Sequence, residues 1–165
     1  MMTVIIRQAQ NTDIVPLCQL VHAFHEFHVA GLPLRLASLG SLNSFDTGEL
    51  GSKLLQIIED TKAAVFVAER DGHLVGFAEV YFRQDEPNPA VVSHAFGYLQ
   101  SLMVQAEART QGIGKSLLVR AEKWAQIKGA EEMRLETWEF GQGPLKFYEK
   151  FGYKTLKRTL VREFS

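Results

Sequence analysis

Cysteine is scarce in this chain, since Cys18 is the single cysteine among 165 residues. No disulfide can form within the chain, and the sequence has no Cys-x-x-Cys pair of the kind that binds zinc or carries out redox chemistry. Cys18 falls in the segment expected to form the first helix, where a small buried side chain is the ordinary role of a free cysteine. The sequence therefore predicts a fold that depends on its apolar core rather than on disulfide bonds.

Long apolar runs and an excess of one charge are also missing. No stretch approaches the ~18 apolar residues that a membrane-spanning helix needs, and Met1 to Arg7 lacks the pattern of a signal peptide. Eighteen basic residues face nineteen acidic ones, so no strong overall field attracts a polyanion. We expect a cytoplasmic protein that binds neither nucleic acid nor membranes.

No repeat and no Pro/Gly/Ser-rich linker divides the chain, so residues 1–165 are expected to form one domain. Alternating and helical apolar patterns predict the elements, and Asp71-Gly72 predicts a hairpin turn. The expected strands are 3–8, 64–70, 74–83, 96–104, 132–138 and 153–162, and the expected helices are 11–30, 49–59, 112–128 and 144–151. This order predicts an α/β fold with a mixed, mostly antiparallel sheet of six to seven strands and helices on both faces.

A strand, a short loop and a helix start follow one another between Tyr98 and Leu118 (YLQSLMVQAEARTQGIGKSLL). Unpaired N–H groups at a helix N-terminus attract anions, and glycine lets a phosphate approach the backbone closely. Gly112 and Gly114 supply the glycines, while Arg109 and Lys115 add positive charge. The segment predicts a site for a phosphate or pyrophosphate.

Three phosphate-binding motifs compete for this segment. Leu117 occupies the third glycine position of GxGxxG, and Arg109 occupies the first glycine position of a P-loop that Gly114-Lys115-Ser116 would otherwise complete. The pattern [RQ]xxGx[GA] is satisfied throughout by residues 109–114. On this loop the sequence resembles the GNAT N-acetyltransferase superfamily, whose members use it to hold the pyrophosphate of acetyl-CoA.

The segment from Leu135 to Tyr153 (LETWEFGQGPLKFYEKFGY) is similar to the strand, loop and helix that end in FYEKxGF in the same superfamily. The resemblance implies a GNAT-like architecture, acetyl-CoA as co-substrate, no metal, and Tyr148 as the acid that protonates the leaving thiolate. It also implies a set of cofactor-binding positions, the first three acting through the main chain: Leu102, Met103, Val104, Arg109, Thr110, Gln111, Gly112, Ile113, Gly114, Lys115, Ser116 and Gly141.

Two positions depart from the family pattern. Gln100-Ser101 stands where many relatives carry acidic residues that include the general base, and Gly141 stands where asparagine usually helps to hold the cofactor. Strand alternation places Glu79 on the same face as Phe77 and Tyr81, where apolar neighbours would raise its pKa and suit it to act as the base. His94 and a water relay are the alternatives.

His22, His25 and His28 recur along the first expected helix. The spacing describes a polar helix face better than a metal site. By resemblance, this helix and the segment from Gly31 to Asp46 border the acceptor pocket, so His25 and His28 are expected to contact the substrate.

Together these features predict an N-acetyltransferase that transfers an acetyl group from acetyl-CoA to a primary amine by direct attack in a ternary complex. The acceptor is a small molecule or a peptide, and the resemblance implies a homodimer as a partner state. A non-catalytic acyl-CoA-binding or sensing module and a P-loop nucleotide enzyme remain as alternatives.

Overall fold

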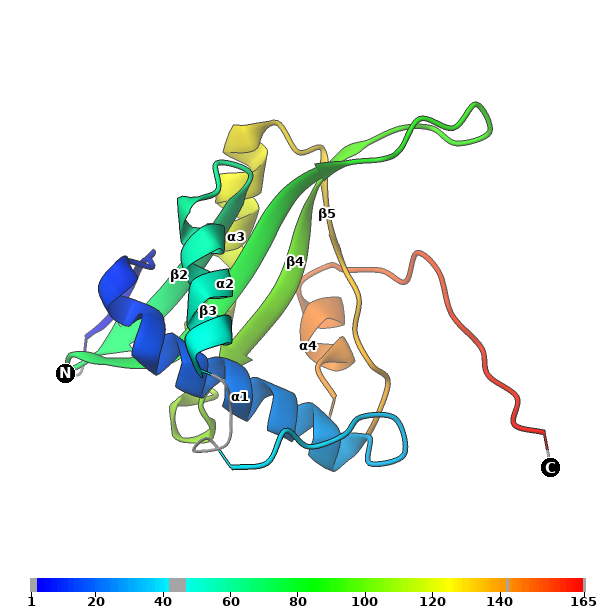
Figure 1. Cartoon of the computed structure of the whole chain (residues 1–165). Coiled ribbons are helices and arrows are strands. Elements are labelled where there is room, and N and C mark those ends of the chain that lie inside the picture. Colours follow the sequence, from blue (N-terminus) through cyan, green and yellow to red (C-terminus); the bar gives the residue numbers. More distant parts are fainter. Residues whose placement is uncertain (1–2, 42–46, 142, 165) are drawn as a thin grey trace.

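A twisted sheet forms the centre of the molecule in the computed structural model, which describes residues 3–41, 47–141 and 143–164 (Figure 1). Within these residues, five strands pair in the order β1-β2-β3-β4-β5. The strands are β1 (Val4–Gln8), β2 (Ala63–Arg70), β3 (His73–Gln84), β4 (Ala95–Val104) and β5 (Glu132–Leu135). The helices are α1 (Ile14–Gly31), α2 (Thr47–Glu59), α3 (Ile113–Lys128) and α4 (Leu145–Lys150), with 3-10 turns at Asn11–Asp13 and Ala106–Ala108.

The first four strands form an antiparallel meander. Asp71 and Gly72 connect β2 to β3 with φ angles of 52° and 78°. Both are positive, as a tight hairpin turn with the right-handed twist of its strands requires. The hairpin that the sequence predicted at this position is therefore confirmed.

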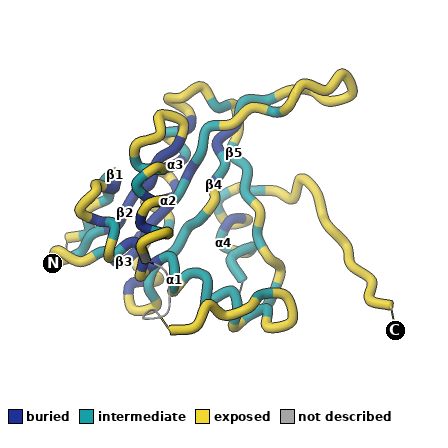
Figure 2. Tube along the Cα trace, in the orientation of Figure 1, coloured by how far each residue is buried: buried dark blue, intermediate teal, exposed yellow. Residues whose placement is uncertain are grey.

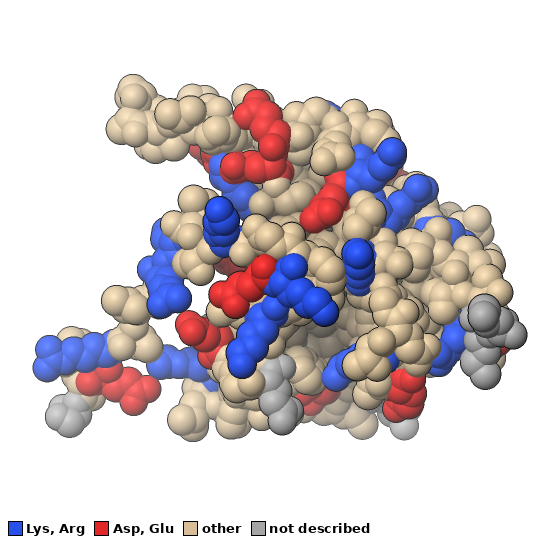
Figure 3. Space-filling view, turned by 180° about the vertical axis from the view of Figure 1, so that it is seen from behind, with Lys and Arg blue, Asp and Glu red and all other residues tan. Residues whose placement is uncertain are grey.

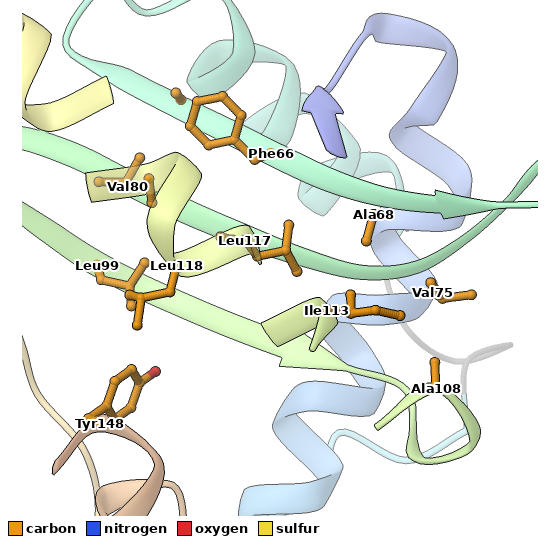
Figure 4. Close-up of a cluster of buried hydrophobic side chains, with 13 residues drawn as sticks. Phe66, Ala68, Val75, Val80, Leu99, Ala108, Ile113, Leu117, Leu118 and Tyr148 are labelled. Carbon is orange, nitrogen blue, oxygen red and sulfur yellow. The ribbon is translucent and has the colours of Figure 1, made fainter. Parts of the chain in front are cut away.

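Two apolar cores cover the two faces of the sheet. On one face α3 packs over the strands, and its buried Ile113, Leu117 and Leu118 meet Phe66 and Val80 of the sheet (Figure 4). On the other face α1 and α2 pack against the opposite side chains of β2 and β3. The buried segments of Figure 2 lie mainly along the sheet and the inner sides of the helices. The predicted α/β architecture, with helices on both faces, is confirmed.

The edge strand β5 is parallel to β4 and pairs with it only from Glu132 to Leu135, opposite Phe96 to Leu99. The strand predicted to reach residue 138 thus ends at Leu135, because the chain turns away from β4 there. α4 lies beside the part of β4 that β5 leaves uncovered (Figure 1). This divergence creates the opening discussed below.

The strand expected at residues 153–162 is absent from the structure, so the sheet has five strands among the described residues instead of six to seven. Leu156, Leu160 and Val161 in this segment are 83%, 89% and 70% exposed. The alternation favours a strand, but no described strand lies beside the segment to pair with it. Within the described ranges, no helix is both long and apolar enough to cross a bilayer.

Arg7 and Asp13 fix β1 to the start of α1. The Nη1 and Nη2 atoms of Arg7 donate hydrogen bonds to Asp13 at 2.7 and 2.9 Å, and the Gln10 amide donates to the same carboxylate at 2.8 Å. Asp13 is only 6% exposed. The hydrogen bonds from Arg7 hold the pKa of Asp13 below its ordinary value, against the opposing effect of burial.

Candidate active site

β4 changes its pairing at Gln100. Glu79 of β3 lies opposite Ser101 and Val80 lies opposite Leu99, so Gln100 is an extra residue in a β-bulge. Pairing with β5 ends at Leu99. Beyond this point, the backbone groups of β4 that face away from β3 have no strand partner within the described chain. They are available to a ligand that enters between the two strands.

The side chains on this part of β4 belong to the cores. Leu102 and Val104 pack partly buried against the core under α3, while Met103 packs against the core on the α1 side. Contacts of Leu102, Met103 and Val104 with a ligand in the opening would therefore use their main chain, as the resemblance implies.

The N-terminus of α3 faces the end of this opening. Gly112 occupies the N-cap position with φ 80° and ψ 0°, and no side chain caps the helix. The N–H groups of a first helical turn lack partners in their own helix and carry the positive end of the helix dipole. A Cβ added at Gly114 would lie 3.4 Å from the Phe147 ring and 3.7 Å from Val104, so Gly114 sits between α4 and β4. The side chain of Ile113 is buried in the core, so only the backbone of this residue can contact a polar ligand.

Hydrogen bonds within the chain hold the loop before α3. The Nε atom of Arg109 donates to the Val104 carbonyl at 2.9 Å, which joins the loop to the last residue of β4. Thr110 has a positive φ of 63°, and its hydroxyl donates to the Arg109 carbonyl at 2.6 Å. Gln111 donates to the Glu107 carbonyl and accepts from Arg70. The loop is thus shaped by its own polar groups.

Two predicted positions in the first turn of α3 point in different directions. The ammonium of Lys115 lies 5.8 Å from the centre of the Phe151 ring, on the side of α4. Ser116 donates its hydroxyl to the Gly112 carbonyl at 3.2 Å and lies beside Ile6 of β1. Lys115 therefore lies on the side of α4, and Ser116 lies on the side of β1.

Tyr148 of α4 packs into the core under α3 with 7% of its surface exposed. Its ring contacts the rings of Phe147 and Tyr153, at centroid distances of 5.3 and 5.6 Å. Figure 4 shows its hydroxyl pointing from α4 toward β4. Among the described residues this oxygen has no hydrogen-bond partner, and it is not sealed from solvent. Burial raises the pKa of Tyr148, so the phenol keeps its proton at neutral pH.

Glu79 lies on the opposite face of the sheet from Tyr148, with β4 between them. Its carboxylate accepts a hydrogen bond of 2.5 Å from the Tyr81 hydroxyl and another from the Ser101 hydroxyl. Burial raises the pKa of Glu79, and the two hydrogen bonds oppose that rise. The structure therefore places a partly buried carboxylate with a raised pKa beside the bulge. The direction of the pKa shift agrees with the expectation from the alternation of β3, whereas the two hydroxyl partners were not expected.

The histidines of α1 bind the following segment. The Nε2 atoms of His22 and His25 donate to the carbonyls of Gly40 and Ala37, both at 2.9 Å. His28 donates from Nδ1 to the Phe24 carbonyl at 2.9 Å. Its ring also lies 4.6 Å from the Phe24 ring and 6.0 Å from the Phe140 ring.

Thus His25 binds the segment that follows α1, and the ring of His28 contacts Phe140 in the loop that follows β5. Residues 42–46 of the expected acceptor segment lie outside the described residues. In the described ranges, no three His, Cys, Asp or Glu side chains gather closely enough to hold a metal ion.

The loop after β5 approaches α1 closely at Gly31. A Cβ at this glycine would lie 2.4 Å from the Phe140 ring, closer than any side chain can come. Gly141, the position of the family's asparagine, is exposed, and no atom lies within 4 Å of the Cβ that it lacks. The loop is therefore anchored by Phe140, while Gly141 leaves open space beside it.

The arrangement of strands, loop and helix agrees with a comparison of the sequence with known families. Residues 34–153 match the Acetyltransferase (GNAT) family. The chain belongs to this family, and its activity class is N-acetyl transfer. A relative from Bacillus subtilis, the uncharacterized N-acetyltransferase YhfO, is 28% identical over 150 residues that cover 90% of this chain and 89% of the relative. An aminoglycoside N(6')-acetyltransferase type 1 from Stenotrophomonas maltophilia is 37% identical over 82 residues, which cover 49% of this chain and 53% of that enzyme.

Solved structures show the same fold at lower sequence identity. A mutant form of the BH1408 protein of Bacillus halodurans superposes with a TM-score of 0.85 at 18% identity and covers 98% of this chain and 99% of its own. The aminoglycoside N-acetyltransferase AAC(6')-Iy in complex with CoA has a TM-score of 0.72 at 21% identity, with coverage of 99% and 96%.

Sequence reasoning missed three features of this GNAT site. The bulge at Gln100 has no signal in the residue types, because Gln100 suits an ordinary strand. The hydrogen bond from Ser101 to Glu79 depends on that bulge. The contact between Gly31 and Phe140 had a weak signal, since a glycine at a helix end indicates either a cap or a close approach.

Proposed function

We propose that this GNAT protein binds acetyl-CoA between β4 and β5 and transfers the acetyl group to the primary amine of a small molecule. The parting of β4 and β5 next to the uncapped start of α3 is the observation that supports the proposal most directly. The opening offers unpaired strand backbone to the amide groups of a pantetheine arm. The helix start offers N–H groups and a positive dipole end to the pyrophosphate.

In this reaction the amine nitrogen attacks the carbonyl carbon of the thioester in a ternary complex, and the bond from carbon to sulfur then breaks. A backbone N–H of β4 near Leu102 stabilises the oxyanion that develops. The leaving thiolate takes a proton from the hydroxyl of Tyr148. The substituted nitrogen loses its extra proton to water, and the phenolate of Tyr148 regains a proton from water. The Tyr148 hydroxyl has no other partner in the described chain and faces β4 (Figure 4).

The attacking amine must first lose a proton. Glu79 can accept it directly or through water, because its pKa is raised and it lies beside the bulge on the face covered by α1. The acceptor then approaches from the α1 side of the sheet, where His25 and His28 border the expected pocket. Tyr148 and Glu79 act on opposite sides of β4, one on the thiolate and the other on the amine.

Aminoglycosides form the first class of acceptor to test, because aminoglycoside N-acetyltransferases occur among the relatives in both sequence and structure. Polyamines and short peptides complete the panel. The assay measures release of the CoA thiol with and without each amine, and mass spectrometry identifies the acetylated product. We expect release that depends on an amine, with one acetyl group in the product.

The same assay tests the alternative of a non-catalytic acyl-CoA-binding module, which Gln100 and Gly141 favour because both lack the family's functional side chain. Binding of acetyl-CoA without amine-dependent thiol release across the panel would support that alternative. A thermal shift with ATP and magnesium tests the P-loop alternative. A ligand at 100 times its dissociation constant stabilises the fold by about 2.7 kcal/mol, and we expect acetyl-CoA, not ATP, to do so.

A further inference from the structure

The ends of β3 and β4 that lead to their connecting hairpin extend beyond α1 and α2 (Figure 1). On this face of the sheet α1 packs mainly against β3, and α2 packs mainly against β2. Side chains alternate along a strand, so Tyr81 and Arg83 of β3 share the face of Glu79, and Tyr98 of β4 lies directly opposite Tyr81. The acceptor approaches from this side in the proposed function, so these side chains are placed to contact the part of the acceptor that follows its amine.

Arg83 lies over two tyrosine rings on this face. Its guanidinium carbon is 4.1 Å from the centre of the Tyr98 ring and 5.1 Å from the centre of the Tyr81 ring. A guanidinium is attracted to the face of an aromatic ring, and stacking there leaves its N–H groups free to bind another partner. Arg83 is exposed, and within the described residues it forms no hydrogen bond and no ion pair. The two rings therefore hold a positive charge whose donors have no partner in the described chain.

Arg134 of β5 shows the contrast with a guanidinium that is fully used. It also stacks on a ring, with its guanidinium carbon 4.0 Å from the centre of Phe96. Its Nη1 and Nη2 atoms donate to Asp85 at 2.5 and 2.8 Å, and its Nε atom donates to Glu132 at 2.5 Å. Arg83 shares the stacking but lacks the carboxylates. A planar guanidinium with free donors matches the two oxygens of a carboxylate or phosphate group.

Glu79 and Arg83 carry opposite charges on one face of β3, but they form no ion pair with each other. Tyr81 lies between them, and its hydroxyl donates to Glu79 at 2.5 Å. The two charges still interact at a distance. Burial raises the pKa of Glu79, and the charge of Arg83 is among the effects that oppose the rise. The face thus presents a negative and a positive group that one tyrosine keeps apart.

The spacing of these two groups limits the size of a molecule that contacts both. Residues two apart on one face of a strand are separated by about 7 Å. The guanidinium of Arg83 lies over Tyr98, which is opposite Tyr81, so it is about one such step from Glu79 along the strand. An acceptor that contacts both groups therefore needs a few carbon atoms between its amine and its anion. A straight chain such as 5-aminopentanoate has this length.

We propose that Arg83 determines the specificity of the acceptor site and that the acceptor carries an anionic group, a carboxylate or a phosphate, in addition to its amine. The inference rests on the proposed function, because it names the substrate class of the same site. The amine lies at Glu79, and the anion accepts two hydrogen bonds from Arg83. Such a molecule complements the charges of the site, whereas an amine with several positive charges leaves Arg83 without a partner.

Two acceptors that differ only in charge test the proposal. 5-Aminopentanoate carries a carboxylate, and 5-aminopentanamide is its neutral counterpart of equal length. We expect the wild type to have a kcat/KM at least about tenfold higher for the acid, because hydrogen bonds between charged groups are the strong ones. Arg83→Gln should bring the ratio of acid to amide close to one. The ratio cancels any effect of the substitution on Glu79, since both acceptors present the same amine. 4-Aminobutylphosphonate in a second arm shows whether a phosphate-like anion binds better than a carboxylate.

Other substitutions at Arg83 separate its charge from its shape. Arg83→Lys should retain only part of the preference, because an ammonium keeps the charge without the planar pair of donors. Arg83→Glu should reverse the preference and favour cadaverine, a diamine of similar length, over 5-aminopentanoate.

Arg120→Gln is the matched control. Arg120 of α3 is exposed, and its guanidinium carbon lies 5.4 Å from the centre of the Phe66 ring. The substitution removes the same charge from the same kind of contact on the other face of the sheet. Basic and acidic side chains are interspersed on the back of the molecule (Figure 3). Arg120→Gln should therefore keep the wild-type ratio of acid to amide.

A binding measurement keeps the proposal testable without turnover. Calorimetry in the presence of CoA should show that 5-acetamidopentanoate, the product, binds the wild type at least about tenfold more tightly than Arg83→Gln. If no amine supports thiol release, the proposed function fails, and the role of Arg83 is decided by this measurement alone. A ratio near one in the wild type, a ratio that Arg83→Gln leaves unchanged, or equal affinities of the two proteins for the product would overturn the proposal.

Discussion

Replacing Tyr148 with phenylalanine separates catalysis from stability. The hydroxyl of Tyr148 has no hydrogen-bond partner within the described chain, while its ring packs in the core under α3. Phenylalanine keeps the ring and removes only the hydroxyl. Because no internal hydrogen bond is lost, we expect the free energy of unfolding to change by less than about 1 kcal/mol.

The effect on turnover should be much larger. Loss of a general acid lowers kcat by about 10²–10⁴-fold, which corresponds to about 2.7–5.5 kcal/mol in the activation free energy. KM for acetyl-CoA should change little, since the expected cofactor contacts lie on β4 and α3. Burial raises the pKa of Tyr148, so the wild-type acid stays protonated through the neutral range and should produce no loss of kcat there as pH rises.

Tyr153→Phe is the matched control, because the two rings lie 5.6 Å apart and the substitution is the same. Tyr153 donates a hydrogen bond to Glu122 at 2.7 Å. Removing a hydrogen bond to a charged group costs about 1.5–3 kcal/mol, so Tyr153→Phe should lower the melting temperature by about 3–12 °C while turnover remains. Steady-state kinetics and thermal unfolding of both variants measure the contrast. Normal turnover in Tyr148→Phe would refute its role as the acid and leave it a core residue.

Three further substitutions test other parts of the structure. Gly114→Val should weaken acetyl-CoA binding by about tenfold or more in calorimetry, since bulk at this position enters the space between α4 and β4; unchanged affinity would remove the start of α3 from the cofactor site. In the wild type, kcat/KM should fall as pH drops through the raised pKa of Glu79, because the base must be deprotonated, and Glu79→Gln should abolish this limb. A limb that persists and follows the pKa of the amine would exclude Glu79. Asp13→Asn should lower the free energy of unfolding by about 2–3 kcal/mol at neutral pH. The stabilisation from Asp13 is present above its ordinary pKa of 3.8 and is lost as pH falls through its lowered folded pKa, so denaturation midpoints of variant and wild type should converge in acid. Equal midpoints at neutral pH would contradict the role of the Arg7 contact.

Most elements of the fold could be predicted from local patterns in the sequence. Strand alternation and helical spacing depend on which side of a segment is buried, and here burial follows a simple two-sided sheet. The turn at Asp71-Gly72 and the start of α3 at Gly112 were predictable for another reason, since both need positive φ angles that glycine adopts readily.

The end of β5 and the fate of residues 153–162 were not predictable in this way. Apolar and β-branched residues favour an extended chain, but they do not determine whether a neighbouring strand is present. β5 ends at Leu135 although Thr137 and Trp138 suit a strand, because the backbone diverges from β4. Pairing of an edge is a long-range property, so the local pattern overestimated the number of strands.

The candidate site also has a part that depends on local sequence patterns and a part that depends on long-range strand pairing. The loop from Arg109 to Gly114 could be found from sequence because a helix start with glycines has a recognisable local pattern. The surroundings of Glu79 could be found only in part. Alternation placed Glu79 beside Tyr81, whereas the contact with Ser101 comes from the register of β4.

Gln100, the extra residue of the β-bulge, reverses the alternation of side chains between the two faces of the sheet along β4. Before it, Leu99 points into the core under α3; after it, Leu102 and Val104 point there, while Met103 belongs to the other core. If Gln100 paired as an ordinary strand residue, alternation would turn Ser101 toward α3 and send Leu102 toward α1. The far half of β4 would then be inside out, with a polar hydroxyl in the apolar core and a leucine facing Glu79. Deletion of Gln100 would instead keep every later side chain on its present face. We therefore expect β4 to tolerate the deletion of Gln100 better than a register in which Gln100 pairs with β3.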